Sequence, residues 1–230
     1  MITIAVLLCQ RKLTDWKISL PAVFSQTYSD YTVYLNIQID AGKENEWEEL
    51  YDFLSKQTIK YHIDEWTLES TWNPIPTIQN EQDNRGRIFP ICTARNMALM
   101  YAKYNYSSHI LFVDADVTIP KNSIERLLGA NKSIIGGIVY GRGKGTGQKY
   151  ITGEHNYKQH NNPRGIKEVD YSTCGFLLIQ REVFRKISFS FDPETCLVDD
   201  PLFAKQAREA GYPWYVDIYF SAQHHSNNQA

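Results

Sequence analysis

The sequence is poor in features that mark several common protein classes. Its four cysteines lie far apart and form no C-x-x-C pair, so the spacing typical of a zinc site is absent. No glycine precedes Gly42, which excludes a glycine-rich phosphate loop after the first strand, as dehydrogenases have. No apolar run approaches the roughly 18 residues of a membrane-spanning helix. The net charge of −2 argues against a broad basic surface for nucleic acid.

The overall composition is that of a globular protein. Hydrophobic residues make up 43% of the chain and charged residues 22%, both ordinary values. A chain of 230 residues can form one large domain or two small ones. The apolar stretch near the N-terminus follows no basic residue and precedes no cleavage site, so it predicts a core strand and not a signal peptide. We therefore expect a cytoplasmic protein with reduced thiols.

Strand-like and helix-like segments alternate in the first half of the chain. The expected strands are residues 2–8, 31–39, 61–68 and 110–113. The expected helices are residues 15–28, 44–57 and 93–104, with Pro21 kinking or delaying the first and Thr93 capping the third. This alternation is typical of a parallel sheet covered on both faces, in which ligands bind at the carboxyl ends of the strands.

The second half of the chain contains a less regular series of elements. It predicts a helix over 123–128, strands over 133–140, 172–180 and 214–220, and a helix over 199–210 that stops at Gly211. Residues 141–165 are rich in glycine and polar side chains. That segment favours equally a lid that closes over a ligand and an ordinary surface loop.

Two carboxylates stand at the end of the fourth expected strand. Asp114 and Asp116 are two residues apart, so on an extended strand their side chains would point to the same side. Oxygen ligands of this kind suit hard cations such as Mg²⁺ or Mn²⁺, which often bridge to substrate phosphates. For the isolated tripeptide, a turn-forming or helix-capping role explains the two acids about equally well.

Five other residues have both a functional and a structural interpretation. Arg95 would meet a phosphate or pair with a surface carboxylate. Asp199 and Asp200 open a helix, where they would cap it and complement its dipole, or one of them would act as a general base. His224 and His225 would complete a metal site or belong to an exposed polar tail.

Taken in order, these pieces resemble the inverting, family-2-like glycosyltransferases of the GT-A fold. The resemblance spans most of the chain and is carried by four stretches: ITIAVLLCQRKLTDWKISLPAVFSQTYSDYTVYLNIQIDAG, TARNMALMYAKYNYSSHILFVDADVTIP, CGFLLIQREVFRKISFSFDPE and VDDPLFAKQAREAGYPWYVDIYFSAQHH. The second stretch is the most specific, because it resembles the family's A-R-N helix followed by its metal-binding D-x-D strand.

The resemblance implies a fold and an activity. The expected fold is a single Rossmann-like α/β domain of GT-A type over residues 1–230, with a mostly parallel central sheet flanked by helices and a smaller acceptor-side subdomain. Residues 1–116 would form the nucleotide-sugar-binding half and residues 117–230 the acceptor-side half. The implied enzyme moves a sugar from a nucleotide-diphosphate donor to an acceptor hydroxyl with inversion, using Mn²⁺ or Mg²⁺, and a UDP-sugar is the family's commonest donor.

The same resemblance implies the ligands of the cation. Asp114 and Asp116 would hold it on the donor diphosphate, with Asp116 the more direct ligand. His224, counted from the last strand, falls on the family's metal-ligand histidine, and His225 is the neighbouring alternative.

The remaining implied roles concern the donor and the reaction. Asp40 would lie near the nucleotide base, and Arg95 would line the nucleotide or diphosphate pocket. Asp200 falls where the family has its catalytic Asp, with Asp199 in place of the usual Glu. The chain departs from the family where Leu202 replaces a repeated Asp and where residues 9–12 replace a P-x-x-N turn. It also lacks Q-x-x-R-W, so a processive polysaccharide synthase is not expected.

Two other functions are consistent with parts of this pattern. A sugar-phosphate nucleotidyltransferase would share the metal and the nucleotide pocket, although it usually has an early glycine-rich loop. A non-catalytic nucleotide-sugar-binding protein would explain the altered pair Asp199–Asp200. The residues identify neither the donor sugar nor the acceptor, which could be a glycan, a lipid, a protein or a modified nucleic acid.

Overall fold

A computed structural model describes most of the chain. The described residues are 1–9, 14–40, 44–68, 85–140, 165–190 and 199–225, and every structural statement below concerns these alone. Their elements in chain order are β1 (Ile2–Cys9), α1 (Trp16–Val23), β2 (Tyr31–Asp40), η2 (Glu44–Trp47), α2 (Glu48–Ser55), β3 (Tyr61–Leu68), α3 (Arg85–Tyr104), β4 (His109–Asp114), β5 (Val117–Thr118), α4 (Ser123–Gly129), β6 (Ile134–Tyr140), β7 (Ile166–Val169), β8 (Phe176–Gln180), α5 (Arg181–Phe184), α6 (Asp199–Glu209) and β9 (Trp214–His224).

The strands form one sheet in the order β3-β2-β1-β4-β8-β6-β9-β5, and β7 pairs with β9. Strands β1 to β4, β6 and β9 run in one direction, whereas β5, β7 and β8 run in the other. The mostly parallel α/β sheet that the sequence predicts is therefore confirmed. The carboxyl ends of β1, β2 and β4 lie at one edge, because the register pairs Leu7 with both Asn36 and Asp114.

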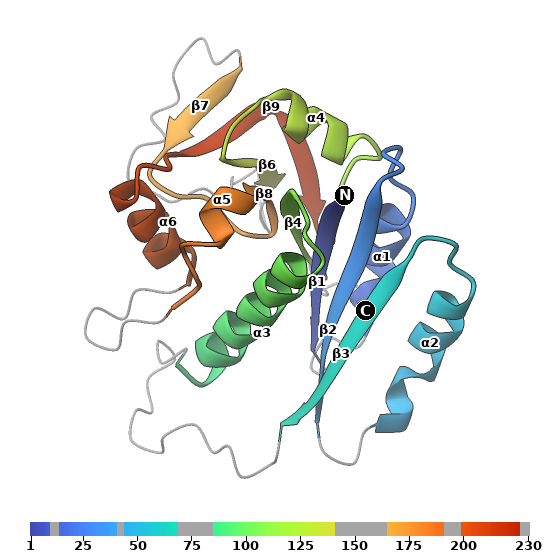
Figure 1. The fold of residues 1–230 in the computed structure, drawn as a ribbon. Coiled ribbons are helices and arrows are strands. Elements are labelled where there is room, and N and C mark those ends of the chain that lie inside the picture. The colour runs from blue at the N-terminus through green and yellow to red at the C-terminus, as the bar shows by residue number, and fades with distance from the viewer. Residues whose placement is uncertain (10–13, 41–43, 69–84, 141–164, 191–198, 226–230) are drawn as a thin grey trace, which may run out of the picture.

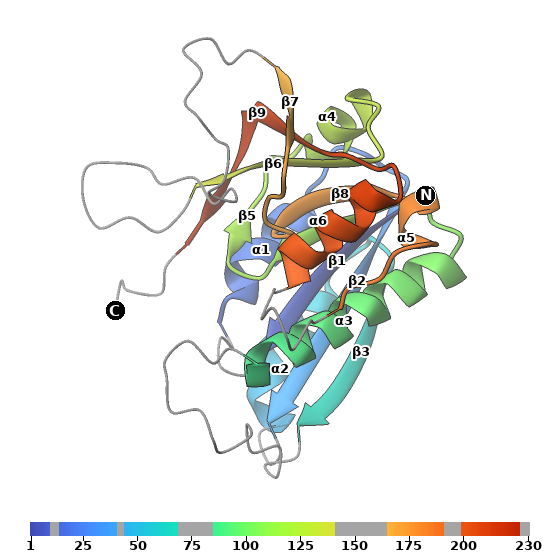
Figure 2. The same cartoon turned by 90° about the vertical axis from the view of Figure 1, so that its left-hand side faces the viewer.

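Helices cover both faces of this sheet (Figure 1). Alternate residues of each strand point to opposite faces, so one core contains Leu111 and Val113 beneath α1, α2 and α4. The other contains Ile110 and Phe112 beneath α3, α5 and α6. Figure 2 shows α6 next to α3 on this second face. By the same alternation Asp114, two residues beyond Phe112, belongs to the α3 and α6 face.

The helix before β4 begins earlier than the sequence predicts. Helix α3 starts at Arg85, so Thr93 is an internal residue of the helix and not its cap. Small residues explain how its central part packs, since Ala94, Ala98 and Ala102 are spaced at i and i+4 and are buried. They let the helix axis approach the sheet closely. Helix α1 is shorter than the predicted helix over 15–28. It ends at Val23 and carries Pro21 inside it.

The last helix ends where the sequence predicts. Gly211 has a φ of +85°, its N–H donates to Arg208 O, and the N–H of Tyr212 donates to Ala207 O. This pair of bonds is the Schellman arrangement, which favours glycine because other residues are strained at positive φ. Two strands begin or end elsewhere than predicted. Strand β8 starts at Phe176, and β9 continues to His224.

None of the helices in the described part of the chain is both long and apolar enough to span a lipid bilayer.

Candidate active site

The two predicted acids follow one another at the end of β4 but do not share a strand. Strand β4 ends at Asp114, and Ala115 and Asp116 form a turn before β5. The expectation that both side chains point to the same side of an extended strand is therefore wrong. Asp114 lies near Arg95, with 3.8 Å between its Oδ1 and Nη2 of the arginine. Asp116 is directed to the end of β9 and is buried.

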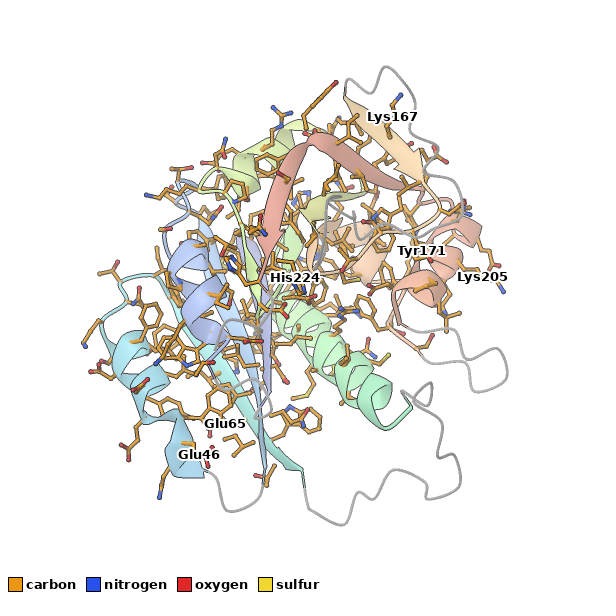
Figure 3. The ribbon with its side chains drawn as sticks, turned by 180° about the vertical axis from the view of Figure 1, so that it is seen from behind. Glu46, Glu65, Lys167, Tyr171, Lys205 and His224 are labelled. Carbon is orange, nitrogen blue, oxygen red and sulfur yellow. The ribbon has the colours of Figure 1, made fainter. Side chains whose placement is uncertain are left out.

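Asp116 meets His224, which comes from the far end of the chain. Oδ2 of Asp116 lies 3.4 Å from Nε2 of His224, and both side chains are largely shielded from solvent. The register brings the two together because β5 pairs antiparallel with β9, with Val117 opposite His224. Figure 3 shows His224 at this end of β9.

A bulge interrupts β9 before the part of the strand that carries His224. The pairing of β6 with β9 shifts register between Gly137 and Ile138. Gly137 lies opposite Asp217, whereas the next residue, Ile138, lies opposite Ser221. Buried Asp217 stabilises the bulge, since its Oδ1 accepts from the Tyr219 N–H at 3.1 Å and its Oδ2 accepts from Arg126 Nε at 2.7 Å. Bulges bend a strand and redirect its side chains. Strand β9 is strongly bent in Figure 1.

Arg95 and Asp200 form a second pair on the α3 and α6 face of the sheet. Nη1 of Arg95 donates to Oδ1 of Asp200 at 2.5 Å, and the backbone N–H of Cys174 donates to Oδ2 of Asp200 at 3.1 Å. The arginine side chain is 7% exposed and the aspartate side chain 20%. Asp200 lies in the first turn of α6, before Pro201, where a carboxylate and a proline are both favoured.

Gly175 brings the segment before β8 close to Asp114. The Asp114 N–H donates to Gly175 O at 3.1 Å, and the Gly175 N–H donates to Thr173 Oγ1 at 3.0 Å. A Cβ on Gly175 would lie 2.5 Å from Oδ2 of Asp114. Because Gly175 has no side chain, there is room for the Asp114 carboxylate at this position.

A family comparison decides the class of the protein. The sequence model of the family described as "Glycosyltransferase family 25, N-terminal domain" matches residues 2–218. The chain belongs to this glycosyltransferase family. The match confirms the glycosyltransferase predicted from the motifs, although the sequence resembled family 2 and the matching family is described as family 25. No curated protein sequence matches the glycosyltransferase significantly.

Solved structures confirm the GT-A type of fold. A mannosyltransferase from Pyrobaculum calidifontis, solved with GDP-Man and Mn²⁺, has a TM-score of 0.60 at 11% identity and covers 100% of this chain and 58% of its own. TarS 1-349 from S. aureus with UDP-GlcNAc has a TM-score of 0.58 at 13% identity, over 99% and 60%. A197 from STIV has 0.50 at 16% identity, over 99% and 87%. The glycosyltransferase thus spans about three fifths of the TarS and mannosyltransferase chains.

The residues at the end of β4 suit a divalent cation without yet forming a complete site. No three carboxylate, imidazole or thiol groups stand together at metal-binding spacing in the described ranges. Asp116 and His224 are nevertheless within 3.4 Å, and the space beside Asp114 would be filled by a Cβ at position 175. Two carboxylates and an imidazole form a donor set that Mn²⁺ accepts. Asp116 and His224 therefore supply two donors that suit the cation, and Asp114 stands two residues from Asp116 along the chain.

The remaining predicted residues have separate outcomes. The His225 ring has another partner, because its Nε2 lies 3.0 Å from Thr118 Oγ1, while its backbone N–H donates to Asp116 O. Asp40 ends β2 and Asp199 begins α6, but their side chains lie outside the described residues. The predicted lid also lies outside them, except for Gly165.

Sequence reasoning did not predict the contacts of three contributors to the candidate site. The backbone N–H of Cys174 and the space at Gly175 have no signature in side-chain chemistry. Phe189 is the third, since its ring lies 5.3 Å from the Arg95 guanidinium. The A-R-N motif gave one signal for Phe189, because its asparagine, Asn96, holds the Phe189 backbone. The Asn96 amide donates to Phe189 O and accepts from the Phe189 N–H, each at 2.8 Å.

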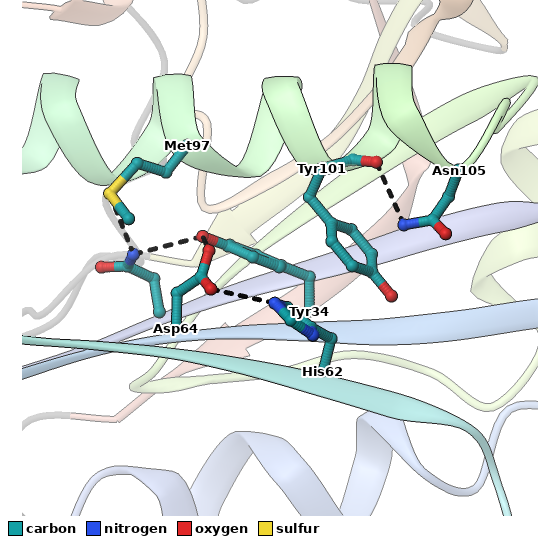
Figure 4. Close-up of polar contacts among 7 residues, drawn as sticks. Tyr34, His62, Asp64, Met97, Tyr101 and Asn105 are labelled. Atoms are coloured by element: carbon teal, nitrogen blue, oxygen red, sulfur yellow. Dashed lines mark hydrogen bonds and ion pairs between the residues drawn. The ribbon is translucent and has the colours of Figure 1, made fainter.

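A separate polar cluster lies between α3 and the edge strand β3 (Figure 4). His62 contacts Asp64 at 2.9 Å, Asp64 accepts from the Tyr34 hydroxyl at 2.7 Å, and His62 stacks on Tyr101. Burial, with the nearby Asp64 carboxylate, raises the pKa of the Tyr34 phenol above its ordinary value. A groove of about 520 Å³ runs beside this cluster and is lined in part by Met97, Met100 and Tyr104. None of the predicted site residues lines it.

Proposed function

We propose that this glycosyltransferase moves a sugar from a nucleotide-diphosphate donor, a UDP-sugar, to an acceptor hydroxyl in a metal-dependent reaction that inverts the anomeric centre. The observation that carries the proposal is the convergence of Asp116 and His224, 108 positions apart in the chain, just after the carboxyl end of β4, where Asp114 stands. Neighbours of the same fold were solved with UDP-GlcNAc and with GDP-Man and Mn²⁺, which supports a nucleotide-sugar donor and a divalent ion.

The cation would be Mn²⁺ or Mg²⁺, held by Asp114, Asp116 and His224. When bound, it supplies positive charge that stabilises the diphosphate leaving group. His224 takes this role in preference to His225, because only His224 places a ring nitrogen beside Asp116. Asp40, at the end of β2, is proposed to lie near the nucleotide base, which fits the position of that strand end beside β1.

Asp200 is proposed to be the general base of the reaction. The acceptor oxygen forms a bond to the anomeric carbon while its proton passes to the Asp200 carboxylate. The bond from the anomeric carbon to the diphosphate oxygen breaks, and its electron pair leaves with the nucleoside diphosphate. Attack from the face opposite the leaving group gives inversion. Asp199, one residue earlier in the first turn of α6, is proposed to assist.

The test of this reaction is the anomeric configuration of the product. With water as the acceptor, a transferase of this type hydrolyses its donor slowly and releases the free sugar. An NMR spectrum taken early in the reaction shows which anomer of that sugar forms first. We expect the anomer opposite to that of the donor. Retention of configuration would contradict the single displacement and the role of Asp200.

The variant Asp200→Asn separates catalysis from binding. The amide keeps the shape of the side chain but accepts a proton far less readily, so turnover falls by about 100-fold or more. Binding of the nucleoside diphosphate, measured by calorimetry, stays within a few-fold of the wild type. A wild-type protein that binds donor but never turns it over, with any acceptor, would instead be a non-catalytic nucleotide-sugar-binding protein.

A further inference from the structure

Arg95 stands between two carboxylates to which the proposed function gives different tasks. Its Nη1 lies 2.5 Å from Asp200, the proposed base, and its Nη2 lies 3.8 Å from Asp114, a proposed cation ligand. The guanidinium is nearly buried, with 7% of the side chain exposed. A group placed in this way has little surface left to offer a nucleotide, and one of its N–H donors is already bonded to the Asp200 carboxylate.

The Asp200 carboxylate is held from two sides. Arg95 donates to Oδ1, and the Cys174 N–H donates to Oδ2 at 3.1 Å. The two donors come from different parts of the chain and restrict the orientation of the carboxylate. An ionised carboxylate accepts about four hydrogen bonds, so lone pairs remain on both oxygens to receive a proton.

Arg95 is itself held by its surroundings. The Phe189 ring covers the guanidinium at 5.3 Å, a distance typical of a cation–π contact. Asn96, the next residue on α3, binds both the backbone N–H and the C=O of Phe189. Helix α3 therefore fixes the arginine and the ring above it together. Arginine suits this place because its flat fork can face two carboxylates at once, whereas lysine is a single point charge.

We propose that Arg95 is a positioning residue, which orients the Asp200 carboxylate for proton acceptance and links it to Asp114, and that it does not bind the nucleotide. The inference rests on the proposed function, because it assigns to Asp200 the role of base. It replaces the prediction from family resemblance that Arg95 lines the nucleotide pocket. It follows that Arg95 contributes to kcat and not to donor affinity.

The first experiment compares Arg95→Met and Arg95→Lys with the wild type. Donor hydrolysis with Mn²⁺ gives kcat, and calorimetry with the nucleoside diphosphate and Mn²⁺ gives Kd. We expect kcat of the Met variant to fall by about 100-fold, with Kd changed by less than about threefold and the Lys variant intermediate. Arg208→Met is the matched control, since Arg208 pairs with Asp170 at the surface and its loss leaves both values unchanged.

A double-mutant cycle tests whether Arg95 acts through Asp200. In an Asp200→Asn background, Arg95→Met lowers kcat by less than about threefold, because the partner it positions no longer accepts a proton. Fully additive losses would overturn the inference. So would an Arg95→Met variant that keeps kcat and binds the nucleoside diphosphate more than tenfold less tightly, because that result marks a nucleotide ligand.

Failure of the proposed function gives a different result from failure of this inference. If the wild type binds and hydrolyses no nucleotide sugar, the proposed function fails, and a cycle of melting temperatures then tests the link. Each single variant lowers Tm by several degrees, about 5 °C, and the double variant by clearly less than the sum. Additive shifts would show that the two side chains are not coupled and would reject the inference without any activity measurement.

Discussion

The variant Gly175→Ala tests how closely the candidate active site is packed. The added Cβ would lie 2.5 Å from Oδ2 and 2.9 Å from Cγ of Asp114. Ordinary contact begins at 3.4 Å, so the carboxylate oxygen has to move by about 0.9 Å, which is 3.4 minus 2.5. Gly175 is not among the glycines with positive φ. The change is therefore steric and leaves the backbone conformation accessible to alanine.

Two losses are expected from this displacement. The atoms in the way are the far end of the Asp114 side chain, which is 39% exposed and can move, so the free energy of unfolding falls by no more than about 1 kcal/mol, measured by urea denaturation. Displacing Asp114 also weakens binding of Mn²⁺ in the presence of a nucleoside diphosphate by about 10–100-fold, measured by calorimetry.

A second glycine provides the matched control. Gly129 ends α4 and has no atom within 4 Å of its added Cβ. Gly129→Ala is expected to leave Mn²⁺ binding unchanged and to raise stability by up to about 1 kcal/mol, through a lower entropy of the unfolded chain. The reasoning is refuted if Gly175→Ala matches the wild type in both stability and Mn²⁺ binding.

Three further predictions concern other parts of the molecule. His224→Ala weakens Mn²⁺ binding about tenfold or more, whereas His225→Ala does not, and equal losses in calorimetry would contradict the assignment. Arg126→Gln leaves buried Asp217 without its charged partner, so the free energy of unfolding falls by about 1–3 kcal/mol in urea; an unchanged midpoint would count against a stabilised bulge. Burial and the N-terminal amine lower the pKa of His109, so the unfolded chain binds its proton more readily and stability drops as pH falls below about 6.5. His109→Gln shows a smaller drop, and equal pH dependence would exclude this cause.

The order of strands and helices could be predicted because their signals are local. Alternation in β1 and β2 and the buried run of β4 are visible in the residues themselves. The start of α3 was missed, and the helix runs through Gly86 and Pro90, two residue types that local preference disfavours inside a helix. Local preference is a weak guide where tertiary packing decides the boundary.

Candidate site residues could be proposed from the sequence, but their mutual contacts could not. Asp114 and Asp116 were identified from their place at a strand end, yet the turn after Asp114 sends them toward different partners. The pair of Arg95 and Asp200 joins residues separated by 105 positions. Such a pair depends on how α3 and α6 pack on one face of the sheet, which periodicity alone does not determine.

The measurement that tests the central claim most directly is donor hydrolysis with Mn²⁺ across a panel of nucleotide sugars, comparing the wild type with Asp116→Ala. We predict that the wild type releases a nucleoside diphosphate from a UDP-sugar, that chelation of the ion stops the release, and that the variant shows none. Release that is independent of the metal and unaffected by Asp116→Ala would contradict the proposed metal site. Neither binding nor release from any donor would contradict the proposed transferase reaction.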